Sequence, residues 1–360
     1  MKTLIPLTTF SVLAAAAATS LTSAQTAATS IPVGYITMDV PANADTTIAP
    51  GLTRPTLFAG GSTSISGDGV GATGLVESAF VSPACYLKVT NGTLEGMMFP
   101  ITANTASTIT VEAGASTLED LGFVSGNTFR VIPYWTLNTL FPDGAGVGGT
   151  ADALNPTSYV LVSDFAGTGA NRSSGQVFFY CSGDVELDLP AGWYDNADPF
   201  AGTVNDTPID PTIQYVIRSS AASSVVVTGE VPSAQQITEI VVAATTNDNY
   251  MAAPFPIDTS LQESGLQSVV DATSDALNPS EYVFVYDDLA TGYNKGASAA
   301  YFYCSGDVEL DLPAGWYDNA DPFAGIVTDK ILKAGRAFFI RKAAGTPAVL
   351  DWLAPLPYTP

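Results

Sequence analysis

Short apolar runs make up most of the hydrophobic pattern of this chain. The runs YVLV at 159–162 and YVFVY at 282–286 combine β-branched and aromatic residues, and so do QVFFYC and AAYFYC, which end at Cys181 and Cys304. Runs of this length and composition are typical of buried strands. In GDVELDL at 183–189 acidic and apolar residues alternate, which predicts a half-buried strand with an acidic outer face.

The N-terminal part follows the same pattern. Residues 85–111 predict three strands separated by the turns TNG and ANTAS, and 129–142 predicts another strand. Two short helices are expected, one starting at Ser116 with capping-box spacing to Glu119 and one at 264–272. The chain is therefore expected to be mainly β, built from antiparallel sandwich- or barrel-like modules.

A duplication organises the C-terminal half. The 24 residues FYCSGDVELDLPAGWYDNADPFAG occur at 179–202 and again, without a change, at 302–325. At the same offset of 123 the similarity continues outward, with Asn171 matching Asn294 and Arg218 matching Arg341. Recent gene conversion and a surface that both copies must present explain the identity equally well.

The expected organisation follows from this repeat. It comprises a signal peptide (1–24), an N-terminal β domain (25–150), a first repeat module (151–232), a connecting segment (233–273) and a second repeat module (274–360).

The first residues predict export. Lys2, an apolar run from Leu4 to Ala18 and small residues around Ala24 match a secretory signal peptide. The run is shorter than the ~20 residues of a membrane-spanning helix, which disfavours an anchor. We therefore expect a soluble exported protein of the periplasm, cell surface or extracellular space.

Charge and composition exclude several function classes. The formal net charge is −23, and loss of the single charged residue in 1–24, Lys2, makes it −24. Such a chain repels nucleic acid and anionic lipid. The absence of histidine excludes Ser–His and Cys–His nucleophiles and the common zinc sites. Cys85, Cys181 and Cys304 are expected to be buried thiols, with a Cys181–Cys304 bond as the alternative.

Three stretches carry a resemblance. PYWTLNTLFP, the spacing G-x-x-F-x-I-x-x-N-T at 96–105 and VVVTGEVP are similar to an uncharacterised family of exported proteins from verrucomicrobial bacteria. The resemblance implies a Gram-negative exported protein. It implies no activity and no functional residues.

Two candidate ligand sites lie in the repeated block. An exposed aromatic platform for sugars or protein is one hypothesis, and packing of these rings in the core is the alternative. Calcium bound by the oxygen-rich loop is another, and turn capping by the same side chains is its alternative. The platform residues are Trp193, Tyr194, Trp316 and Tyr317, and the calcium residues are Asp195, Asn196, Asp198, Asp318, Asn319 and Asp321.

A basic stretch distinguishes the second copy from the first. Lys330, Lys333 and Arg336 lie in it, whereas the matching part of the first copy contains only Arg218. Head-to-tail contact between molecules is one interpretation, and a solvated charged hairpin is the other. The leading functional hypothesis is a non-catalytic envelope or extracellular protein that acts by self-assembly or adhesion. A calcium-assisted pair of carbohydrate-binding modules is the alternative, and a glycan-active enzyme is a second alternative.

Overall fold

The computed structural model describes residues 31–165 and 167–359. Strands dominate this part of the chain, and its one α-helix, α1 (Leu137–Leu140), has four residues. The expected mainly β fold is thus confirmed. No helix in the described part is long and apolar enough to cross a membrane. The expected signal peptide lies outside the described residues.

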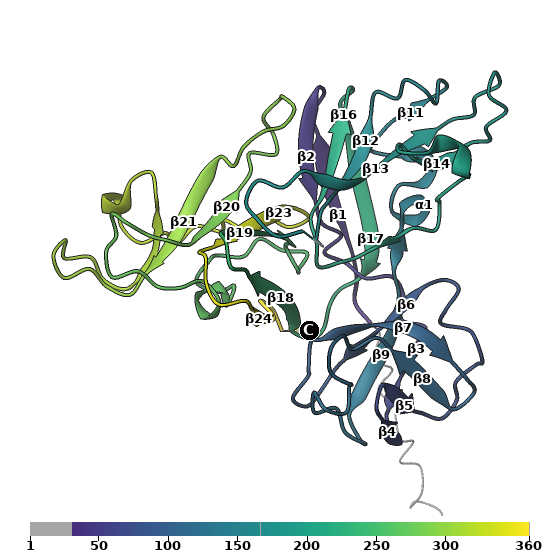
Figure 1. Ribbon diagram of the computed structural model, residues 1–360, viewed down its shortest axis with the longest axis horizontal. Helices are drawn as coiled ribbons and strands as arrows, with labels where there is room; N and C mark the ends of the chain where they lie inside the picture. Colours follow the sequence, from purple (N-terminus) through teal and green to yellow (C-terminus); the bar gives the residue numbers. More distant parts are fainter. Residues whose placement is uncertain (1–30, 166, 360) are drawn as a thin grey trace, which may run out of the picture. The chain divides into compact units, whose positions relative to one another are not determined.

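Module 1 is built on one sheet that combines distant parts of the chain. Its strand order is β2 (Ala44–Ile48), β16 (Tyr215–Ser219), β12 (Tyr159–Ser163), β13 (Ser174–Cys181) and β14 (Gly192–Asp195), all antiparallel (Figure 1). β11 (Gly149–Thr150) runs parallel to β13. Two short sheets complete the module, β1 (Val33–Val40) with β17 (Ser223–Glu230), and β10 (Trp135–Thr136) with β15 (Pro208–Ile209).

Module 2 repeats this order. Its sheet runs β19 (Asn247–Ala252), β23 (Ala337–Lys342), β20 (Tyr282–Val285), β21 (Ala299–Cys304) and β22 (Gly315–Asp318). β18 (Gln236–Val242) pairs with β24 (Ala348–Ala354) as β1 pairs with β17. The duplication therefore includes two N-terminal strands in each module, β1 and β2 in one and β18 and β19 in the other.

A third body lies between β2 and β10 in the chain. It is a seven-stranded sheet in the order β3, β9, β6, β7, β8, β5, β4 around its own apolar core. The strands are β3 (Phe58–Gly61), β4 (Ser64–Ser66), β5 (Gly69–Gly71), β6 (Cys85–Val89), β7 (Met98–Asn104), β8 (Thr108–Val111) and β9 (Thr128–Pro133). We call it the inserted domain, because β2 and β10 on either side of it both pair with strands of module 1.

Strand pairing differs from the expected boundaries in two places. The expected N-terminal domain (25–150) contains β1 and β2, which belong to module 1, and the expected connecting segment (233–273) contains β18 and β19, which belong to module 2. The physical reason is that the inserted domain separates β1 and β2 from most of module 1 in the chain, and too little similarity to β18 and β19 remains in the sequence to show that they correspond.

The structure differs from the expected local structure in three stretches. GDVELDL is a tight turn rather than a strand: Asp184 and Leu189 exchange backbone hydrogen bonds around it, and Asp188 has a φ of 55°. Its period-two pattern has no strand partner. The helix expected at 264–272 is a three-residue 3₁₀ turn, η3 (Leu266–Ser268), and the stretch from Ser116 forms turns.

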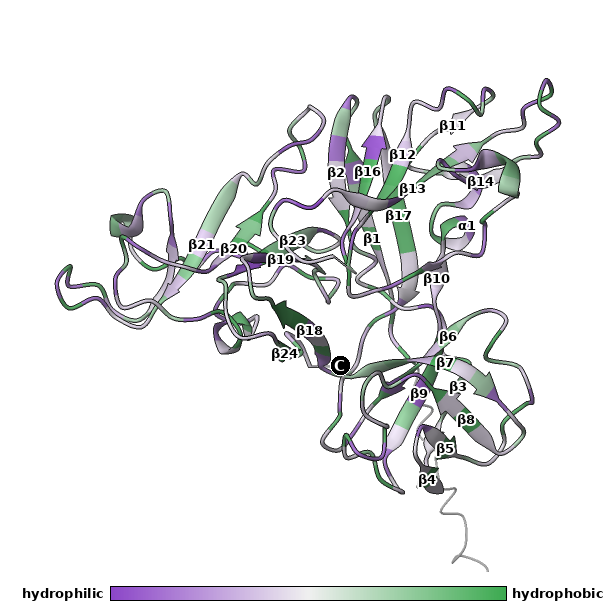
Figure 2. Cartoon of the chain, viewed as in Figure 1, coloured by the Kyte–Doolittle hydropathy of each residue, from purple (hydrophilic) through white to green (hydrophobic). Residues whose placement is uncertain are grey.

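The hydropathy colouring of Figure 2 shows apolar stretches along the strands of each body. In each module the repeated block adds a small apolar cluster beside the main core. Phe179, Cys181 and Tyr194 pack with Ala153 in module 1, and the matching residues do so in module 2. All three cysteines are buried free thiols, which confirms the favoured expectation.

Candidate functional site

The aromatic pairs of the repeated block lie in the core. Trp193, Tyr194, Trp316 and Tyr317 are each 0% exposed. The Trp193 indole N–H donates to the carbonyl of Phe141 at 3.3 Å, and each tyrosine hydroxyl donates to a proline carbonyl four residues earlier. The exposed platform expected from these residues is wrong. Their strands are covered on both faces, and the rings pack in the apolar clusters of the two modules, as the alternative expected.

The loop carboxylates are used by the backbone. Asp195 Oδ1 accepts from the amide of Ala197, and Asp198 Oδ1 caps the 3₁₀ turn η2 (Pro199–Ala201). Asp318 and Asp321 do the same in the copy, and Asn196 and Asn319 are exposed. Among the described residues no group of three or more His, Cys, Asp or Glu side chains could hold a metal ion. The arrangement matches turn capping, and it does not gather these oxygens around one point.

The three basic residues proposed for assembly have different surroundings. Lys330 is exposed, and Lys333 forms a surface ion pair of 2.9 Å with Asp258. The Arg336 side chain is only 14% exposed and donates to the carbonyls of Thr47 and Asp39. Arg336 therefore joins module 2 to β1 and β2 within the chain, which corrects its assignment as an intermolecular contact.

Most of each repeated block forms a compact acidic segment made of a turn, the strand β14 or β22 and a loop, here called tip 1 (183–202) and tip 2 (306–325). Asp184 organises tip 1 because its carboxylate accepts from the amides of Ala153, Glu186 and Leu187. These backbone hydrogen bonds, above all the one from Ala153, lower the pKa of Asp184, and the Ala276 amide does the same for Asp307 in tip 2. The two tips thus share one internal scaffold.

Both tips also expose the same apolar side chains. Val185 and Val308 are each 96% exposed, and Phe200 and Phe323 are 61% and 62% exposed. The two valines contribute almost no buried area to the described chain, and more than half of each phenylalanine is exposed. The tips therefore present two copies of one surface, in which a valine and a phenylalanine stand among carboxylates.

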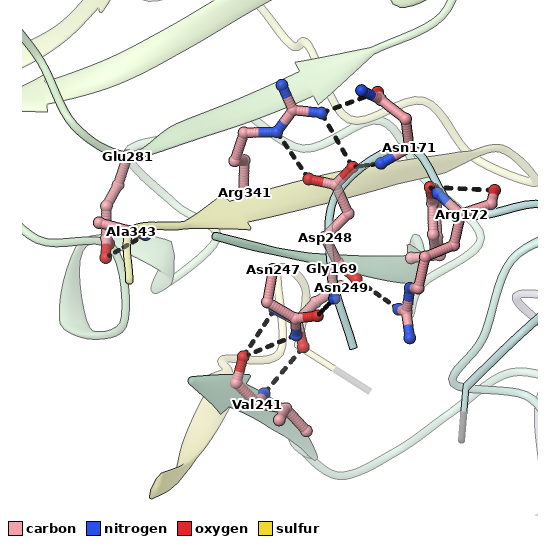
Figure 3. A network of polar contacts seen from close by, with 11 residues as sticks. Gly169, Asn171, Arg172, Val241, Asn247, Asp248, Asn249, Glu281, Arg341 and Ala343 are labelled. Carbon is pink, nitrogen blue, oxygen red and sulfur yellow. Dashed lines mark hydrogen bonds and ion pairs between the residues drawn. The ribbon is translucent and has the colours of Figure 1, made fainter. Parts of the chain in front are cut away.

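The two modules hold each other by a reciprocal contact that we call the clasp. In its first half, shown in Figure 3, Arg341 donates through Nε and Nη2 to the two carboxylate oxygens of Asp248, at 2.7 and 2.9 Å. Asn171 lies in the β12–β13 loop of module 1. Its backbone amide donates to Asp248 at 2.7 Å, and its side-chain oxygen accepts from Arg341 at 3.0 Å. A loop of module 1 is thus bound to two strands of module 2.

The second half of the clasp exchanges the roles of the modules. Arg218 donates to both oxygens of Asp45 at 2.7 Å, and Asn294 of module 2 donates to Asp45 at 2.6 Å and accepts from Arg218 at 2.8 Å. Asn171 and Asn294 share a φ of 54°, which asparagine tolerates. The matched pairs Asn171–Asn294 and Arg218–Arg341 were visible in the sequence. Their partners Asp45 and Asp248, 203 positions apart, were not recognised.

A cavity of about 630 Å³ lies where the inserted domain meets the two modules. Its walls come from all three bodies: Tyr86 and Tyr134, the loop with Arg172, the stretch that begins at Asp210, and the strands β18 and β19. The rings of Tyr86 and Tyr134 lie 4.9 Å apart. No part of the sequence pattern indicated this cavity, because its residues come from segments that only the fold brings together.

Comparison of the chain with protein-family models, with curated proteins and with solved structures gives no match.

Proposed function

We propose that this chain is an exported, non-catalytic protein of the cell envelope or extracellular space that acts by self-assembly or adhesion, and that its two tips make the contacts. The observation that carries the proposal is the exposure of Val185 and Val308, at 96% each, within a block that is identical in both copies. The buried residues of the block explain its identity through the fold. The fold does not explain the identity of Val185 and Val308, because their side chains make almost no internal contact.

Exposed apolar side chains rimmed by polar residues mark surfaces for protein contact. The flanking Glu186 and Asp188 in tip 1 are acidic, and so are their copies in tip 2, which favours a partner surface with basic character. Lys330 and Lys333 of a neighbouring molecule supply such a surface. Two equal tips on one chain also give avidity, since the second contact forms at a raised effective concentration.

Molar mass by light scattering during size exclusion tests the proposal. We expect the wild-type chain to form species larger than one chain at low salt. Replacing Val185, Phe200, Val308 and Phe323 by serine should reduce it to a single chain, and a variant changed in one tip should stop at an intermediate size. Val76→Ser, at an exposed position of the inserted domain, is the control and should leave the association unchanged.

A second arm tests adhesion with the same variants. Sedimentation with cell envelopes and with insoluble polysaccharides should retain the wild-type chain and release the four-residue variant. A wild-type protein that is a single chain at all salt concentrations and sediments with neither material would refute the proposed function.

A further inference from the structure

The two modules carry a pocket at corresponding positions, open in module 1 and closed in module 2. The module 1 pocket measures about 380 Å³. The module 2 pocket measures about 20 Å³, space for about one water molecule. At the offset of 123 the shared wall positions are Val162 and Val285, Ser163 and Tyr286, Phe165 and Asp288, Pro208 and Ile331, Ile209 and Leu332, Asp210 and Lys333, Ile213 and Arg336, and Tyr215 and Phe338.

Larger side chains accompany the closure. Ile331 packs against the core of module 2, whereas Pro208 at the matching position of module 1 is exposed and is not part of that module's core. Tyr286 stands where module 1 has the small Ser163. The same strand arrangement therefore accepts a filled pocket, so the open pocket of module 1 is not a requirement of the fold.

The pocket of module 1 has an apolar interior and an acidic edge. Phe178, Ile209 and Tyr215 on its wall are buried. Asp210 belongs to its wall and also to that of the 630 Å³ cavity, as do Phe165 and Ile213, so the two spaces adjoin. A volume of this size lies in the range of small-molecule sites, which are mostly apolar with a few polar groups.

The carboxylate of Asp210 is positioned to receive a positive charge. Thr212 donates its backbone amide and its hydroxyl to Oδ1 of Asp210, at 2.8 and 2.6 Å. Oδ2 of Asp210 takes part in neither of these two bonds. Burial and then the charge of Asp210 raise the pKa of Tyr134, which lines the large cavity, and of Tyr215, which lines the pocket. The negative charge thus acts on both spaces.

We propose that module 1 binds a small organic cation, with an apolar group in the pocket against Phe178 and Ile209 and an ammonium group at Asp210. This site is independent of the tips and adds a ligand to the proposed function. Module 2 lacks it, because the pocket there is filled and Lys333 replaces Asp210.

Titration of the full chain with 2-phenylethylammonium, followed by calorimetry and by saturation-transfer NMR, tests the inference. We expect saturable binding of one cation per chain. The neutral isostere 2-phenylethanol should bind at least about tenfold more weakly, since it lacks the charge-assisted hydrogen bond.

Two variants separate the pocket from the charge. Ser163→Tyr combined with Pro208→Ile gives module 1 the residues of module 2 and should abolish binding without unfolding the chain. Asp210→Asn should weaken the cation about tenfold and leave the alcohol unchanged. Asp206→Asn, which removes the same charge from an exposed position, is the control.

Three results would overturn the inference. The first is no saturable binding to the wild-type chain, and the second is unchanged binding to the filled variant. The third is a result showing that the ligand is not a cation. This would be equal binding of 2-phenylethylammonium and 2-phenylethanol, or binding of cellotetraose in place of 2-phenylethylammonium. None of these outcomes depends on association through the tips.

Discussion

Removal of Asp248 should weaken the contact between the two modules more than removal of Asp45, its counterpart in the other half of the clasp. Its side chain is 0% exposed, and it accepts two hydrogen bonds from Arg341 and one from the amide of Asn171. Asp248→Ala leaves the guanidinium and the amide without these acceptors. Loss of one partner of a buried ion pair costs about 3–5 kcal/mol in the free energy of unfolding.

The second half of the clasp provides a matched comparison. Asp45 makes the same contacts, but its side chain is 12% exposed and water can replace part of what is lost. We therefore expect Asp45→Ala to cost less, about 2–4 kcal/mol. Asn171→Gly keeps the backbone donor and the positive φ and removes only the acceptor for Arg341, so it should cost about 1 kcal/mol.

Guanidinium chloride unfolding measures these costs, and hydrogen exchange locates them. In Asp248→Ala the amide of Asn171 should lose protection, while the amides of the inserted domain keep theirs. A cost for Asp248→Ala below about 1 kcal/mol, the range of an exposed pair, would refute the reasoning, and so would unchanged protection of Asn171.

Three further predictions concern buried charges. Lys342→Ser should cost about 3–5 kcal/mol in denaturant unfolding, because it leaves the buried carboxylate of Glu281 without its cation. Adding Glu281→Ser should recover part of that cost, because module 1 has serine at both matching positions, Ser158 and Ser219. Burial, and then the charge of Arg130, lowers the pKa of Lys88 from 10.5 to about 8. The stability of the wild-type chain should therefore rise between about pH 8 and pH 10.5. Lys88→Met should remove this rise and add about 3 kcal/mol to the free energy of unfolding at pH 7. The lowered pKa values of Asp184 and Asp307 stabilise the fold above pH 3.8, their ordinary value, and this stabilisation is lost as the pH falls through the folded pKa. The double variant Asp184→Asn, Asp307→Asn should therefore show a flatter acid unfolding curve.

The candidate sites show where reasoning from the sequence was insufficient. Trp193 and Tyr194 follow a turn and precede a polar loop, a context that suits exposure as well as burial. Their complete burial depends on strands and core residues distant in the chain, such as Phe141. The alternation in GDVELDL was real, but period two describes side-chain direction only where a partner strand exists. Here Asp184 turns inward to bind three backbone amides, and Val185 turns out.

The sequence by itself determined the fold class, the duplication and the matched pairs Asn171–Asn294 and Arg218–Arg341, because strand composition and exact repetition are local properties. Only the tertiary structure decided which strands complete each module, what the matched pairs bind and where the cavities lie. β2 pairs with β16 about 170 residues later, and the clasp joins Asp45 to residues of both modules. Such contacts depend on backbone hydrogen bonds and on a few side chains at long separation, which leave almost no pattern along the chain.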